Sequence, residues 1–133
     1  MQTFLPYPSF EKSAGCLDYR RLGKQRVEAK QIINAIVNGT GWRNHPVVKM
    51  WQNNIDALMF YHDVVIKEWI GRGYKNNMPL LFKGPVTESL YPSWFGNKEF
   101  HISHQSNLVR KNPTYYRKYF PDIPDDLPYK WIR

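Results

Sequence analysis

The chain has 133 residues, of which 42% are hydrophobic, and 19 lysines and arginines outnumber 11 acidic residues to give a net charge of +8. This composition excludes a disordered tail, and the length predicts a single domain over residues 1–133. A single cysteine excludes an internal disulfide, and no apolar run is long enough to span a membrane, so we expect a soluble, cytoplasmic protein. The positive charge and the 16% aromatic content favour a nucleic acid partner.

The first ten residues contain Pro6 and Pro8, so they are predicted to be extended. Apolar residues such as Phe4 and Leu5 are too frequent here for a free arm. We therefore expect this segment to pack on the body of the protein and to fix the amino terminus in place. Ser13 is expected to cap the helix that follows.

A helix is predicted from about Ala14 or Leu17 to Asn38, with Gly39 as its stop. Cations crowd its first half, and apolar residues follow at helical spacing in its second half. Gly23 inside this helix predicts a close approach by another helix or by a ligand.

One face of this helix is polar, because Asp18, Arg21, Gln25 and Glu28 recur at intervals of three and four residues. An acid set among cations suits an enzyme acting on phosphate polymers. An ordinary solvated amphipathic helix would give the same pattern, and the pattern alone leaves both interpretations open.

Two further helices are predicted, the first beginning at Pro46 and ending at Gly71 and Gly73. The second runs from Lys98 to Arg110, with Asn97 as its cap. It carries His101 and His104, whose spacing without a third ligand is a weak metal signal. We favour a hydrogen-bonding or phosphate-facing role for this pair.

The tail from residue 112 has four prolines and is predicted to be extended. Three of its tyrosines, Tyr115, Tyr116 and Tyr119, surround Arg117 and Lys118. Aromatic rings beside cations suit contact with splayed bases, but the same rings could simply pin the tail to the core.

Four segments resemble the pyrimidine dimer DNA glycosylase family, also called endonuclease V. These are Tyr19-Arg20-Arg21-Leu22, the helix that closes in Arg72-Gly73-Tyr74, the stretch from His101 to Arg110, and Pro113-Thr114-Tyr115-Tyr116-Arg117-Lys118-Tyr119. The run Leu22-Gly23-Lys24-Gln25-Arg26-Val27-Glu28 is similar to a bacterial and phage branch of that family. The resemblance implies an all-α fold of three main helices, with an extended arm at the amino terminus and an aromatic tail.

The resemblance also implies a chemistry. An amino-terminal amine, here that of Met1, attacks C1′ of the damaged nucleotide and forms an imine, and a carboxylate assists. Arg21 stands where the family has its glutamate. Glu28 is our preferred replacement and Asp18 the other candidate. No cofactor and no metal are expected.

We therefore predict a DNA repair glycosylase with AP lyase activity, acting as a monomer on double-stranded DNA with damaged, abasic or modified bases. The alternatives are a non-catalytic DNA-binding protein on the same fold, or another metal-independent enzyme acting on modified DNA or nucleotides with Glu28 and His101 or His104 as acid and base. The residues predicted to contact DNA are Arg20, Arg21, Lys24, Arg26, Trp42, Arg43, His45, His104, Arg110, Lys111, Tyr115, Tyr116, Arg117 and Lys118.

Overall fold

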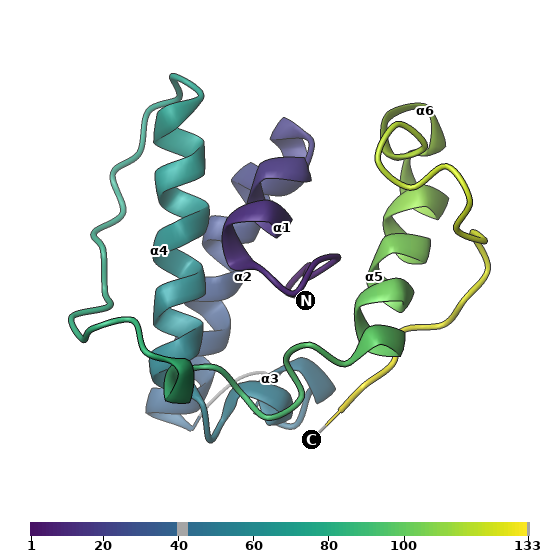
Figure 1. Cartoon of the computed structure of the whole chain (residues 1–133). Helices are drawn as coiled ribbons and strands as arrows, with labels where there is room; N and C mark the ends of the chain where they lie inside the picture. The colour runs from purple at the N-terminus through teal and green to yellow at the C-terminus, as the bar shows by residue number, and fades with distance from the viewer. Residues whose placement is uncertain (40–42, 133) are drawn as a thin grey trace.

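The computed structural model describes residues 1–39 and 43–132, and within these ranges it contains helices and no strand, which confirms the all-α prediction. The elements are α1 (Phe10–Cys16), α2 (Tyr19–Asn38), α3 (Pro46–Trp51), α4 (Ile55–Gly71), the short 3₁₀ helix η1 (Glu88–Leu90), α5 (Lys98–Lys111) and α6 (Pro113–Tyr116). Figure 1 shows α2 and α4 side by side, with α5 on the opposite side and the amino terminus between them. No described helix is long and apolar enough to cross a membrane.

The first predicted helix is two helices. Leu17 leaves helical geometry with ψ 139°, and Asp18 starts α2 by accepting a hydrogen bond from the Arg21 amide. Ser9 caps α1, so the cap predicted at Ser13 is wrong. The Ser13 side chain is instead buried inside α1, where it bonds the backbone of Tyr7. Gly39 ends α2 in the left-handed conformation, as predicted.

The second predicted helix is also divided. Pro46 opens α3 as expected, but α3 ends at Trp51 and α4 starts at Ile55. The intervening residues are polar, and the Asn54 amide closes a turn on the Trp51 carbonyl at 2.7 Å. The apolar stripe continues across this break because both helices contribute to the same core, which is why its spacing did not reveal the turn.

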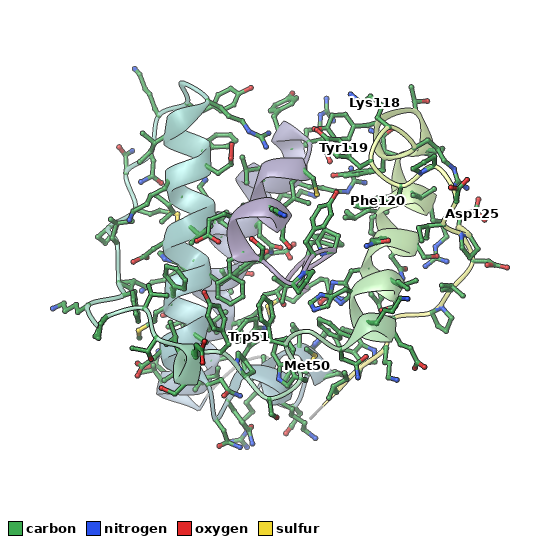
Figure 2. All side chains as sticks on the ribbon, in the orientation of Figure 1. Met50, Trp51, Lys118, Tyr119, Phe120 and Asp125 are labelled. Carbon is green, nitrogen blue, oxygen red and sulfur yellow. The ribbon has the colours of Figure 1, made fainter. Side chains whose placement is uncertain are left out.

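The last predicted helix is confirmed as α5, with Asn97 accepting from the Phe100 amide at its start. The prediction of an extended tail is wrong for α6, where Asn112 caps and Pro113 occupies the first turn. Beyond α6 the described tail has no helix or strand. Figure 2 labels Phe120 on this segment, and its ring centroid lies 5.6 Å from that of Tyr7 in the arm.

Gly23 brings α2 and α4 close together. A Cβ atom at this position would lie 3.0 Å from the Trp69 ring of α4, closer than a normal carbon contact. The close approach by another helix that the glycine predicted is therefore confirmed.

The amino-terminal arm is anchored by buried polar side chains, which satisfy its backbone groups where no strand partner exists. Gln25 on α2 accepts from the Phe4 amide at 2.6 Å and donates to the Gln2 carbonyl at 2.7 Å. The Tyr61 hydroxyl of α4 lies 2.9 Å from the Phe4 carbonyl, and the Trp51 indole donates to the Thr3 hydroxyl at 3.0 Å. The arm therefore packs on the body as predicted, with its path set by these side chains.

Two histidines of α5 hold a single residue of the arm. Leu5 donates its amide to His104 Nδ1 at 3.0 Å, and its carbonyl lies 2.7 Å from His101 Nδ1. The Gly96 amide donates to His101 Nε2, so His101 carries its proton on Nδ1 and donates to Leu5. Hydrogen bonding, one of the two roles we favoured for this pair, is thus what holds the arm against α5.

His104 should make stability fall in acid. Burial, with a smaller contribution from His101, lowers the pKa of His104 to about 3. Below a pH of about 6.5 the unfolded chain therefore binds a proton that the folded chain excludes, so unfolding becomes easier by up to about 1.4 kcal/mol per pH unit. Urea unfolding from pH 7 to pH 4 should show this slope, and His104→Asn, which keeps an acceptor for Leu5 but does not titrate, should flatten it. An unchanged slope in the variant would assign the acid sensitivity to other groups.

Candidate functional site

An open cavity of about 910 Å³ lies where the arm ends beside α2. Ligand sites in proteins commonly have volumes of about 300–1,000 Å³. The cavity is lined by Met1, Gln2, Phe4, Arg20, Arg21, Lys24, Glu28, His45, Lys111, Tyr129 and Trp131.

Helix α2 supplies the charged wall of the cavity. Arg20, Lys24 and Glu28 are four residues apart, so the helix places them in a row on one face. Arg21 lies beside this row, and Lys111, the last residue of α5, adds a fourth cation. Glu28 is the one acid among the described residues that line the cavity. This wall combines a strong attraction for anions with a single carboxylate.

Glu28 contacts the first residues of the chain directly. Its Oε2 accepts a hydrogen bond from the Gln2 amide at 3.1 Å. The Met1 α-amine and the Gln2 amide nitrogen are joined through two atoms, so the amine lies within about 7 Å of that oxygen. Burial and the positive charge of this amine both lower the pKa of His45, which places the amine near that ring as well. An amine, a carboxylate and an imidazole therefore share one cavity.

The tail supplies two aromatic residues to the lining of the cavity. Tyr129 and Trp131 are two residues apart in an irregular segment, and their ring centroids are separated by 5.6 Å. The Trp131 ring also meets the His45 ring edge-on at 5.9 Å. We had not predicted either aromatic residue for the site, although alternate residues of an extended segment share one side.

The family model described as pyrimidine dimer DNA glycosylase matches residues 1–82. The chain belongs to this family. Comparisons with curated proteins and with solved structures found no match. The matched region contains the arm and helices α1 to α4, and hence the amine, the charged row of α2 and His45. Lys111, Tyr129 and Trp131 lie beyond it.

Several residues predicted for the site of this glycosylase-family protein do not line the cavity. Asp18 is the N-cap of α2 and pairs with Arg21 at 3.1 Å. Burial opposes the ionisation of Asp18, but hydrogen bonds from Tyr116 and Arg21 outweigh it and lower its pKa. Arg26 lies 4.3 Å above the Trp69 ring, and Arg43 lines a separate hollow beside α3. The residues that we predicted to contact DNA therefore do not all line one cavity.

Burial also removes two predicted contacts. His104 and Tyr116 have no exposed surface, so neither side chain is available to DNA, and the DNA-contact role expected for each is incorrect. They were misassigned because polar atoms were taken to face solvent, whereas His104 binds Leu5 and Tyr116 binds Asp18. Trp42 lies outside the described residues.

The remaining predicted residues belong to the tail or contact it. Arg110 donates to the Asp125 carbonyl at 3.0 Å, and Arg117 donates to the Ile123 carbonyl at 2.5 Å. Lys118 lies 4.3 Å above the Tyr115 ring. Our alternative for the tail, in which its rings pin it to the core, is supported by Tyr116, which is buried and accepts a hydrogen bond from the Asp18 amide. The DNA contacts predicted for the two arginines, Lys118 and Tyr115 remain predictions.

Proposed function

We propose that the protein is a DNA glycosylase with AP lyase activity, acting on damaged or modified bases, with pyrimidine dimers as the substrate named by its family. The observation that carries the proposal is the Met1 end of the arm lying beside Glu28 in a cavity with four cationic side chains. Membership of the family supplies the substrate class, and the cavity supplies a nucleophile, an acid–base group and phosphate contacts.

In the proposed reaction, the neutral Met1 amine attacks C1′ of the damaged nucleotide. A nitrogen–carbon bond forms as the bond from C1′ to the base breaks, and the base leaves with the bonding electrons and takes up a proton. The sugar ring then opens to give an imine. Removal of a C2′ proton expels the 3′ phosphate, and hydrolysis of the imine returns the free amine.

Glu28 is the proposed acid–base group. It can accept the amine proton, deliver a proton to a leaving oxygen or nitrogen, and stabilise the positive charge that develops at the imine. Arg20, Lys24 and Lys111 would hold the phosphates that flank the extruded nucleotide. Extrusion requires unstacking of the base, which costs less at a lesion than in intact DNA.

A second candidate function is DNA binding without cleavage. It is favoured by Arg21, which occupies the position of the glutamate in the resembled family motif and cannot act as a carboxylate. Arg21 lines the cavity, so it would add phosphate attraction in a binding protein, although its ion pair with Asp18 offsets part of its charge. This candidate predicts salt-sensitive binding with no covalent intermediate.

Borohydride trapping on an abasic duplex tests the proposal. The reagent reduces an imine to a stable amine, so the expected product is a protein–DNA adduct that peptide mass spectrometry assigns to Met1. A tag fused before Met1 removes the free amine and should abolish the adduct, whereas the same tag after Arg133 should not. Salt-sensitive binding without any adduct would establish the second candidate.

DNA binding should weaken about 100-fold between about 50 and 200 mM salt if the four cavity cations contact phosphates. Fluorescence anisotropy with a short duplex measures this slope. The double variant Arg20→Ala/Lys24→Ala should reduce the slope by about two phosphate contacts. Lys67→Ala, at an exposed position of α4 outside the cavity, is the matched control and should leave the slope unchanged. A DNA affinity that does not change with salt concentration would remove the electrostatic basis of the proposal.

Cleavage should survive a chelator, because the proposed nucleophile is an amine and the proposed acid–base group is Glu28. Strand cleavage measured after dialysis against EDTA should match the untreated rate. Activity lost in EDTA and restored by a divalent cation would contradict the proposed mechanism.

A further inference from the structure

The His45 ring is held in one orientation by two contacts. It immediately precedes α3, and its Nδ1 accepts a hydrogen bond from the Val47 amide at 3.1 Å. The ring also meets the Trp131 ring edge-on, with 5.9 Å between the two centroids. His45 is half-buried and lines the cavity together with Met1 and Glu28. A side chain fixed in this way presents a constant geometry to whatever enters the cavity.

The hydrogen bond from Val47 determines which nitrogen of His45 carries the proton. A backbone amide can only donate, so Nδ1 is an unprotonated acceptor and the neutral ring carries its proton on Nε2. A second proton, on Nδ1, would face the Val47 N–H group and break this bond. Burial and the positive charge of the Met1 amine lower the pKa of His45, which also favours the neutral ring. His45 is therefore a neutral N–H donor in a cavity whose other described charged side chains are four cations and Glu28.

The proposed reaction includes a step that needs such a donor. When the sugar ring opens, the C1′–O4′ bond breaks and its electron pair goes to O4′, while the nitrogen lone pair completes the imine. The proton that the nitrogen gives up passes through Glu28 to O4′, which becomes a hydroxyl group. The negative charge that develops on O4′ before this proton arrives is stabilised by a fixed donor that keeps its own proton. A neutral imidazole N–H group has this property, because it releases its proton only in strong base.

We infer that His45 is a second catalytic residue, whose Nε2–H donates a hydrogen bond to the ring oxygen O4′ of the substrate sugar as the ring opens. The inference rests on the proposed function for its substrate and extends it by assigning the stabilisation of the leaving ring oxygen. Glu28 carries out the proton transfers, and His45 neither gains nor loses a proton in the step.

The location of His45 suits the sugar better than a phosphate. O4′ is bonded directly to C1′, so a donor to O4′ must lie close to the amine that attacks C1′. His45 and Met1 line the same cavity, and the charge of the amine acts on the imidazole. The flanking phosphates are farther from C1′, and the cations of α2 and Lys111 are available to them. A neutral donor adds little to the attraction that these cations already provide.

Two substitutions separate the donor of His45 from its role as the cap of α3. Asparagine places its side-chain oxygen near the position of Nδ1 and ends there, so His45→Asn keeps a cap and removes the Nε2 donor. Glutamine extends to about the position of Nε2 and carries an amide N–H there, so His45→Gln keeps a donor and weakens the cap. Circular dichroism shows whether each variant is folded.

Borohydride trapping under single-turnover conditions should distinguish two duplexes. One carries an abasic deoxyribose, whose ring is closed through O4′, and the other carries an open-chain aldehyde without a ring oxygen. On the abasic duplex, His45→Asn should form the adduct about 100-fold more slowly than the wild type, the cost of removing one donor to a developing oxyanion. His45→Gln should recover part of this rate. On the open-chain aldehyde all three proteins should react at similar rates, because no ring has to open.

The outcomes separate the role of His45 from the proposed function. If His45→Asn slows trapping equally on both duplexes, His45 acts only by placing the arm or α3, and the inference is wrong. If His45→Asn reacts with the abasic duplex at the wild-type rate, the inference is also wrong, although the wild-type adduct still supports the lyase. A wild-type protein that forms no adduct with either duplex would reject the proposed function and the role of His45 together. A loss confined to the abasic duplex and partly recovered by glutamine would establish that His45 acts on the ring oxygen.

Discussion

Replacing Glu28 by glutamine is expected to lower the cleavage rate on abasic DNA by at least about 100-fold while DNA affinity stays nearly unchanged. The substitution removes the charge of the one acid among the described residues that line the cavity. The glutamine oxygen can still accept from the Gln2 amide, so the arm should keep its position. Single-turnover cleavage measures the rate, and anisotropy titration with an uncleavable duplex measures the affinity.

Two other acids serve as controls for this result. Asp18→Asn should have a smaller effect, because Asp18 lies outside the cavity lining and asparagine also caps helices well. Glu88→Gln changes an exposed acid of η1 and should leave both the cleavage rate and the DNA affinity unaltered. If Glu28→Gln cleaves at the wild-type rate, Glu28 serves only to hold the arm through Gln2.

The charged wall of the cavity could be predicted because it depends on local geometry alone. Once α2 is helical, residues four apart must share a face, so Arg20, Lys24 and Glu28 form a row wherever the helix packs. The sequence also indicated an arm packed on the body. The distance between the arm and Glu28 could not be derived in this way, because it depends on contacts between remote segments.

Most of the contacts that we did not predict from the sequence are made by buried polar residues. Gln25 was placed on a polar face and His104 among the residues predicted to contact DNA, yet both are buried against the arm. The partner of His104 is Leu5, 99 residues away in the sequence. A polar side chain looks the same in a sequence whether it meets water or a distant amide, so periodicity alone predicts exposure for both.

The helix breaks were missed for a related reason. The apolar spacing runs on through Leu17 because α1 and α2 bury residues in the same core. The local signal was Asp18, which works as an N-cap but was interpreted as part of the polar face. In the tail, Asn112 followed by Pro113 gave the corresponding signal for α6.

Replacing Gln25 by methionine is expected to reduce the free energy of unfolding by about 2–6 kcal/mol, since it leaves two buried backbone groups unpaired. These are the Phe4 amide and the Gln2 carbonyl, which the Gln25 side chain now pairs at 2.6 and 2.7 Å. Methionine is similar in length and apolar, so it fills the space without replacing either hydrogen bond. Urea unfolding at neutral pH, followed by circular dichroism, measures the change.

Gln31→Met makes the same substitution at an exposed position of the same helix, and its effect should stay within about 0.5 kcal/mol. The two Gln25 contacts also fix the position of Met1 at the start of the arm. Gln25→Met should therefore slow imine trapping even at temperatures where the variant remains folded. Unfolding free energies that match for the two variants would mean that the arm finds other partners and that Gln25 does not fix its path. Loss of stability with an unchanged trapping rate would show that Glu28 and Gln2 alone position the amine.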